Sequence, residues 1–163
     1  MKTLIAYATK RGFTKKCAEL LSEKLEGTVE IADIKKSKNM DISSYENIII
    51  GGSVYIGKIR KEVPDFYDRN MDKLLNKNIG LFICGLAEGE VVKKELEACF
   101  PDKLSERALV IDIFGGEYNF DKMNFIEKTV IKKIANTTEN QEVLHLDRIE
   151  KFAEVFNSLQ KKD

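Results

Sequence analysis

The pattern of hydrophobic and polar residues divides the chain into short apolar runs and longer amphipathic segments, which alternate along its length. The apolar runs are rich in isoleucine and lack polar alternation, as expected of strands buried on both faces of a sheet. They predict five strands, at residues 3–7, 29–34, 48–50, 79–84 and 108–114. Apolar residues at helical spacing predict helices at residues 14–25, 62–76, 91–99 and 147–159.

The regular alternation of strands and helices predicts the fold class. Parallel strands joined by helical crossovers form a sheet with helices on both faces, so we expect an α/β three-layer sandwich around a five-stranded parallel sheet. A chain of 163 residues suits one domain of ordinary size. Neither an internal repeat nor a low-complexity linker divides it, and we therefore expect residues 1–163 to form a single domain.

The segment after the first predicted strand has the features of a phosphate-binding loop. Residues 9–14, Thr-Lys-Arg-Gly-Phe-Thr, offer hydroxyls and backbone amides between the end of a strand and the start of a helix. The dipole of that helix favours an anion at this point. Gly12 removes a side chain where the backbone turns, and Thr9 and Thr14 can donate hydroxyl protons to phosphate oxygens. An ordinary helix start capped by Thr14 is the alternative.

Small residues also follow the third, fourth and fifth predicted strands. Ligands of such sheets bind beyond the carboxyl ends of the strands, so these segments should border the same site. The loop at residues 51–58 begins with two glycines, which would let a flat ring system approach the backbone, and its Tyr55 could stack on that ring. A peptide at Ile56 or Gly57 could then address one edge of the ring. The other two segments are residues 84–89 and the turn at residues 115–118.

Charge and motifs exclude several functional classes. The 27 basic and 27 acidic residues balance, which argues against nucleic acid as the main partner. No G-x-G-x-x-G follows the first strand and no G-x-x-x-x-G-K-[ST] occurs, so dinucleotide-binding and P-loop proteins are not indicated. Residues 8–9 and 51–52 lack the carboxylates that a response regulator needs.

The remaining reactive side chains give little support to metal or nucleophilic chemistry. The three cysteines are odd in number and lack metal-ligand spacing, so we expect reduced, mostly buried thiols. His145 is the only histidine, and we expect it at the surface or in packing. No apolar run is long enough to span a bilayer and the chain has no signal-peptide pattern, which predicts a cytoplasmic protein.

An insert separates the fifth strand from the last helix. Residues 115–146 are too long for a structureless loop. Apolar residues at helical spacing predict a short helix, with Met123, Ile126, Val130, Ile131 and Ile134 on one stripe and four lysines on the remaining turns. We therefore expect a basic amphipathic insert at about residues 117–142, which either packs on its own domain or contributes to a substrate or membrane-surface site.

Three motifs resemble those of the flavodoxin superfamily. These are Thr-x-x-Gly-x-Thr at residues 9–14, Gly-x-Ser-x-x-x-Gly at residues 51–57, and an aromatic, basic insert that opens with the turn at residues 115–118. The insert is most similar to that of the menaquinone-dependent, flavodoxin-like protoporphyrinogen oxidases, although it has neither arginine nor tryptophan. The resemblance implies the strand order 2-1-3-4-5, a noncovalent FMN cofactor and electron transfer from a porphyrinogen to a membrane quinone.

The resemblance and the loop positions together predict the FMN-binding residues. They lie after four strands: Thr9, Lys10, Arg11, Gly12, Phe13 and Thr14; Ser53, Val54, Tyr55, Ile56 and Gly57; Gly85, Leu86 and Ala87; and Gly115, Gly116, Glu117 and Tyr118.

Three functional hypotheses follow from this prediction. The first is an FMN-dependent oxidoreductase that passes electrons between a small-molecule substrate and a quinone or redox partner, with protoporphyrinogen as one candidate substrate and peripheral contact at the inner face of the membrane. The second is an electron carrier that has no substrate of its own and serves redox proteins. The third is a flavin-free binding module that kept the fold.

Overall fold

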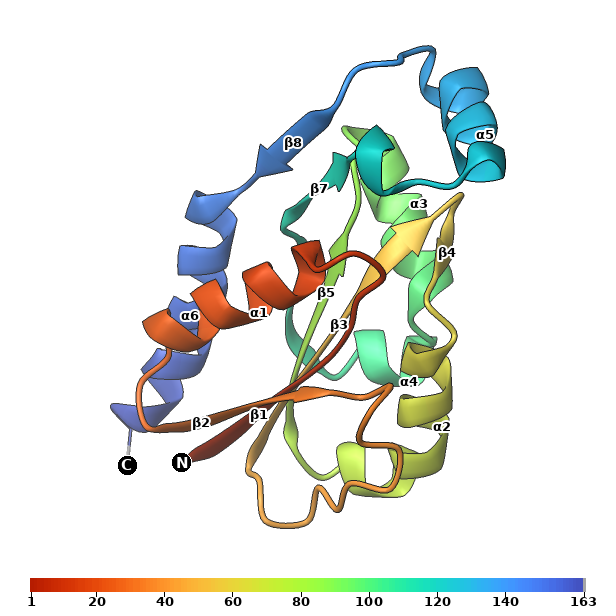
Figure 1. The fold of residues 1–163 in the computed structure, drawn as a ribbon. Coiled ribbons are helices and arrows are strands. Elements are labelled where there is room, and N and C mark those ends of the chain that lie inside the picture. Colours follow the sequence, from red (N-terminus) through yellow and green to blue (C-terminus); the bar gives the residue numbers. More distant parts are fainter. Residues whose placement is uncertain (163) are drawn as a thin grey trace.

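The structure, a computed structural model, describes residues 1–162 (Figure 1). The strands are β1 (Lys2–Ala8), β2 (Thr28–Asp33), β3 (Asn47–Tyr55), β4 (Lys58–Ile59), β5 (Asn78–Cys84), β6 (Ala108–Ile113), β7 (Gly115–Tyr118) and β8 (Gln141–Leu144). The helices are α1 (Phe13–Lys24), α2 (Glu62–Leu74), α3 (Glu90–Cys99), α4 (Asp102–Ser105), the 3-10 turn η1 (Phe120–Lys122), α5 (Phe125–Ala135) and α6 (Leu146–Gln160).

Five strands form the predicted parallel sheet in the order β2-β1-β3-β5-β6. Counting only these five strands, this is the order 2-1-3-4-5, so the predicted fold and order are confirmed. Asn47, at the start of β3, pairs with Thr3 of β1 and with Asn78 of β5. Its buried side chain donates to Thr3 Oγ1 at 3.0 Å and accepts from Asn78 at 2.9 Å, which satisfies a polar group inside the sheet.

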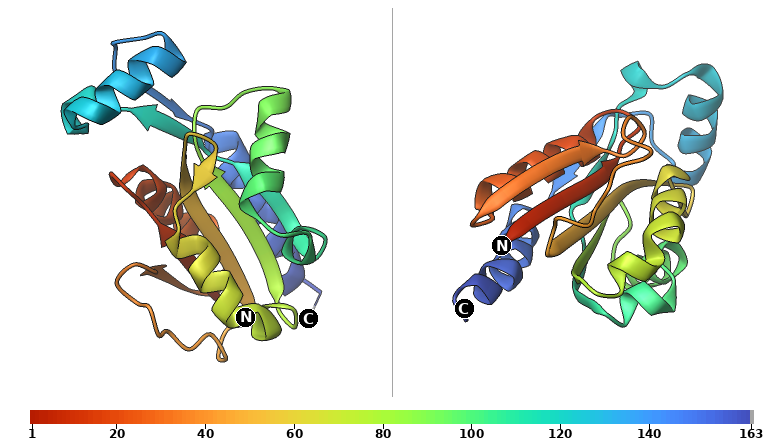
Figure 2. Two further views of the ribbon diagram at one scale, coloured as in Figure 1. Left: turned by 90° about the vertical axis from the view of Figure 1, so that its right-hand side faces the viewer. Right: turned by 90° about the horizontal axis from the view of Figure 1, so that it is seen from below.

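Helices cover both faces of the sheet (Figure 2). On one face α1 and α6 pack over β1, β3 and β5, and the aromatic rings of Phe82, Phe114 and Phe152 form the centre of that core. On the other face α2, α3 and α4 enclose the second core. All three cysteines are buried and free, in agreement with the sequence analysis.

The third strand is longer than predicted. The predicted strand ends at residue 50 and is followed by a loop at residues 51–58, but β3 continues to Tyr55. Gly51 is needed for close packing against Phe82, because a Cβ atom at residue 51 would lie 2.0 Å from the Phe82 ring. Gly51 and Gly52 therefore make room for core side chains, and neither of them lines the cavity described below.

The insert also differs from the prediction, because its ends form strands. β7 and β8 pair in an antiparallel hairpin that carries η1 and α5, so the segment at residues 115–118 is a strand and not a turn. Gly115 has a φ of 102°, and a Cβ atom there would lie 1.9 Å from the carbonyl oxygen of Val143. In Figure 1, α5 stands at the top, beyond the carboxyl ends of β3 and β5.

The predicted apolar stripe of the insert faces two ways. Met123, which precedes α5, and Ile131 are buried and form a small cluster with Phe120, separate from the two main cores. In contrast, the side chains of Ile126 and Ile134 are 73% and 61% exposed. Among residues 1–162, no helix has both the length and the apolar character needed to cross a bilayer.

Candidate functional site

A cavity of about 390 Å³ lies beyond the carboxyl ends of β1, β3 and β5, between the sheet and the insert. Its walls come from the four predicted segments, which the fold brings together. All of the predicted residues line this cavity except Gly12 and Gly115, which shape the backbone behind it. His145 lies outside it, just ahead of α6, and its backbone N–H donates to the carbonyl of Phe114 at 3.0 Å.

The start of α1 has features that suit an anion. Gly12 adopts a φ of 101° and Phe13 begins the helix, one residue earlier than predicted. No side chain caps the helix and its first turn holds no acidic residue. Thr14 does not act as the cap, and its Oγ1 atom is buried without a hydrogen-bond partner among residues 1–162. A buried hydroxyl in this state is uncommon, and here it adjoins the positive end of a helix.

Thr9 supports the same loop from the other side. Its Oγ1 atom accepts a hydrogen bond from the backbone N–H of Gly12 at 2.9 Å. Since that oxygen acts as the acceptor, the hydroxyl proton of Thr9 stays free to donate elsewhere.

Two cations of this loop are held by the insert. The side chains of Lys10 and Arg11 both form ion pairs with Glu127 in the first turn of α5. The Nε of Arg11 also donates to the carbonyl of Lys122 at 3.3 Å. The hydrogen bond from Lys10 is the main cause that lowers the pKa of Glu127, with further contributions from the N–H of Asn124 and the charge of Arg11.

Tyr55 stands at the end of β3, beside a tight turn. Ile56 and Gly57 form this two-residue turn with φ values of 49° and 69°, and Tyr55 pairs with Lys58 across it. A β-branched residue such as Ile56 rarely adopts a positive φ, so the turn is strained at the cavity rim. The Nζ atom of Lys10 lies 4.8 Å from the centroid of the Tyr55 ring, and this cation covers part of the aromatic surface.

The opposite wall is apolar and contains one acid. Six wall residues lie outside the predicted FMN-binding set, although the first of them belongs to the predicted segment 84–89: Cys84, Val91, Glu95, Met123, Ile131 and Ile134. Met123, Ile131 and Ile134 belong to the predicted apolar stripe of the insert, and this stripe is the sequence feature that could have assigned them to the site. Val91 and Glu95 sit four residues apart on α3, and nothing in their local sequence indicates a site. The Oε2 atom of Glu95 is buried without a hydrogen-bond partner among the described residues, and burial raises the pKa of this carboxyl.

Comparison with known proteins identifies the family. A family model described as a flavodoxin domain matches residues 4–144. The chain belongs to the flavodoxin domain family. Its match covers the loop at residues 9–14, the parallel sheet except for the first two residues of β1, and the insert up to the end of β8. The match gives no support to the protoporphyrinogen oxidase branch that the insert had suggested.

Solved structures show the same fold at low sequence identity. Oxidised flavodoxin 1 from Bacillus cereus superposes with a TM-score of 0.59 at 19% identity, over 97% of this chain and 98% of that one. A Fusobacterium nucleatum flavodoxin bound to flavin mononucleotide gives 0.53 at 18% identity, over 99% and 98%.

A larger protein contains the same fold as a part. The rubredoxin:oxygen oxidoreductase of Desulfovibrio gigas gives a TM-score of 0.56 at 16% identity, and this flavodoxin domain covers 36% of that chain. No curated protein sequence matches.

Proposed function

We propose that this flavodoxin domain binds FMN noncovalently and carries electrons between redox proteins. The observation that carries the proposal is the buried, unpartnered hydroxyl of Thr14, which lies at the uncapped start of α1 and borders the cavity. A phosphate group would accept from this hydroxyl and from the free N–H groups of the first helical turn. The family match and the FMN-bound Fusobacterium nucleatum flavodoxin support the same cofactor.

The residues of the cavity fit both ends of FMN. Thr9 and Thr14 supply hydroxyl donors for the phosphate, and Arg11 and Lys10 place positive charge beside the same loop. Tyr55 offers an aromatic surface for the ring system. The space beside Gly57 is open, because a Cβ atom added there would have no heavy atom within 4 Å. When bound, FMN supplies the one- and two-electron chemistry, while the protein binds and orients it.

The protein surface beside the cavity would allow a redox partner to approach. Ile56 and Val91 both line the cavity and are each 54% exposed at its rim. Electrons can pass to a partner that docks there, so the carrier needs no second substrate site.

Replacement of Thr14 tests the proposal. Thr14→Val keeps the shape of the side chain and removes the hydroxyl, and Thr28→Val makes the same change at an exposed position of β2. We expect Thr14→Val to weaken FMN binding by about 10- to 100-fold, since a hydrogen bond to a charged group contributes roughly 1.5–3 kcal/mol. Thr28→Val should bind FMN like the wild type. Equal affinity in all three proteins would refute the phosphate assignment.

An oxidoreductase with an apolar substrate is a second candidate, because the insert supplies part of the cavity wall. Met123, Ile131 and Ile134 line the cavity opposite the phosphate loop, which would suit a quinone or another flat apolar molecule. Anaerobic reduction of the FMN-loaded protein, followed by addition of menaquinone or protoporphyrinogen, tests this candidate. Turnover that needs neither a redox protein nor a membrane would favour the oxidoreductase over the carrier.

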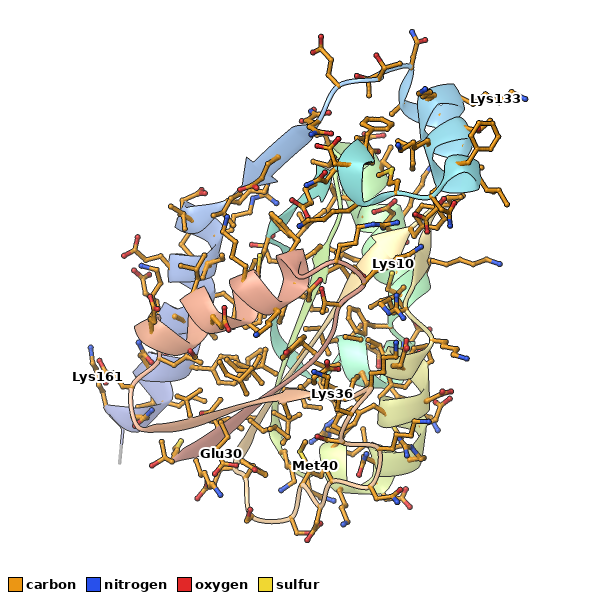
Figure 3. The ribbon with its side chains drawn as sticks, viewed as in Figure 1. Lys10, Glu30, Lys36, Met40, Lys133 and Lys161 are labelled. Atoms are coloured by element: carbon orange, nitrogen blue, oxygen red, sulfur yellow. The ribbon has the colours of Figure 1, made fainter. Side chains whose placement is uncertain are left out.

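Membrane contact by the insert belongs to this second candidate. Phe125 and Ile126 on α5 are 83% and 73% exposed, and Lys133 projects from the same helix into solvent (Figure 3). With Lys128 and Lys132 these residues form a basic surface with an apolar edge, which suits weak association with anionic lipid at about 1 kcal/mol per lysine. Sedimentation with phosphatidylserine vesicles at low and high salt would measure this association.

A further inference from the structure

Two acidic side chains line the cavity among residues 1–162, and Glu95 is the one that forms no ion pair, whereas Glu117 pairs with Lys122. Glu95 lies on α3, and its Oε2 atom is buried without a hydrogen-bond partner among residues 1–162. Burial raises the pKa of its carboxyl, and no cation is among the causes of the shift. An acceptor withdrawn from water in this way destabilises the protein unless something donates to it.

Glu95 lies beside the strand ends that border the cavity. If Gly85 carried a Cβ atom, that atom would lie 3.7 Å from Oε2 of Glu95 and 3.7 Å from the Cβ of Val54. The carboxyl therefore sits where the ends of β3 and β5 adjoin. α3 covers one face of the sheet and α1 the other, so Glu95 and the phosphate loop approach the cavity from opposite faces.

The surroundings of the carboxyl restrict what could donate to it. Apolar side chains such as Leu86, Val91 and Ile131 line the same cavity. Tyr118 lies near Glu95: burial is the main cause that raises the pKa of its phenol, and the charge of Glu95 is the second. Even so, Tyr118 makes no hydrogen bond to Oε2 of Glu95. A molecule in the cavity can supply this donor, and a flat ring with an N–H group at its edge suits such a site.

We propose that Glu95 accepts a hydrogen bond from the ring imide N–H of the bound flavin. This proposal rests on the FMN binding proposed above. The oxidised flavin ring has a single N–H group, so the carboxyl would fix both the depth and the orientation of the ring. Glu95 is in this sense a binding residue that selects flavins with a free imide.

Flavins with and without the donor provide the test. Dissociation constants are measured for FMN and for 3-methyl-FMN, in which a methyl group replaces the imide hydrogen. The proteins are the wild type, Glu95→Leu and Glu97→Leu, the last being an exposed glutamate on the same helix. We expect the wild type and Glu97→Leu to prefer FMN by about 10- to 100-fold, the range of a hydrogen bond to a charged group. Glu95→Leu should bind FMN about tenfold more weakly and lose most of this preference.

The stability of the flavin-free protein gives an independent readout. Because leucine removes an unsatisfied acceptor from an apolar wall, Glu95→Leu should melt at the same or a higher temperature than the wild type while its FMN affinity falls. A glutamate with only a structural role would instead lower the melting temperature and weaken both flavins equally. If Glu95→Leu does not fold, Glu95→Gln replaces it, with a reduced preference expected.

Each result bears on one proposal. A preference for FMN over 3-methyl-FMN that persists in Glu95→Leu, or an unchanged FMN affinity in that variant, overturns the role of Glu95. A wild type that binds neither flavin overturns the proposed function itself. The two failures are therefore distinguishable.

Discussion

Arg11 of the proposed phosphate loop forms an ion pair with Glu127 of α5, although the two residues are 116 positions apart in the chain. Their side chains are 17% and 12% exposed, so the pair is only partly solvated. Glu127 also pairs with Lys10 and completes the capping box of α5 with Asn124. One carboxylate thus joins the proposed cofactor loop to the insert.

Neutralising Glu127 should alter the affinity for the phosphate of FMN. Glu127→Gln frees the charges of Lys10 and Arg11, so we expect FMN to bind more tightly, by up to about fivefold for partly solvated ion pairs. Riboflavin, which lacks the phosphate, should bind equally to both proteins. Fluorescence titration with the two flavins measures this, and an equal gain for riboflavin would contradict the electrostatic explanation.

Acidification should release the insert from the phosphate loop. The pKa of Glu127 in the folded protein lies below its ordinary value of 4.5, so its contribution to stability is complete above that pH and is lost as the pH falls through the lowered pKa. Hydrogen exchange of α5 amides should therefore accelerate in that acidic range before the sheet unfolds. Glu127→Gln should show fast exchange in α5 at neutral pH already. Protection of α5 that is independent of both pH and this substitution would contradict the prediction.

Tyr55→Ala should reduce both flavin affinity and flavin fluorescence quenching. The predicted loss of affinity is about 2- to 10-fold, from an aromatic stacking contribution of roughly 0.5–1.5 kcal/mol. Tyr118→Ala serves as the comparison, since Tyr118 also lines the cavity. If quenching is unchanged in Tyr55→Ala but lost in Tyr118→Ala, the stacking residue is Tyr118.

Deleting residues 120–137 and closing the hairpin should leave the parallel sheet folded. The buried residues of this segment, Phe120, Met123 and Ile131, form a small cluster of their own that is separate from both main cores. We expect near-wild-type secondary structure by circular dichroism and retained FMN binding, with loss of vesicle association and of any quinone turnover. Global unfolding of the deletion variant would show that the insert is part of the core.

The parallel sheet could be predicted because its signals are local. Runs such as residues 48–50 are apolar on both faces, and the glycine and threonine pattern of residues 9–14 marks the loop at the first strand end. The short strands were missed for local reasons too. The turn before β4 places Ile56 at a positive φ that its side chain disfavours, and Gly115 suggests a turn although it is needed for close contact with Val143.

The proposed role of Glu95 and the ion pairs of Glu127 could not be predicted from the sequence. Both lie among other charged residues on helices, where a glutamate normally faces solvent. Their environments depend on elements distant in the chain: the ends of β3 and β5 for Glu95, and the phosphate loop for Glu127. Only the folded arrangement distinguishes them from neighbours such as Glu97.

Titration of the flavin-free protein with FMN and with riboflavin is the most direct test of the proposed cofactor site. We predict one FMN bound per chain, with flavin fluorescence quenched and with riboflavin at least tenfold weaker, since the phosphate hydrogen bonds at the start of α1 each contribute roughly 1.5–3 kcal/mol. Failure to bind FMN, or equal affinity for the two flavins, would contradict it.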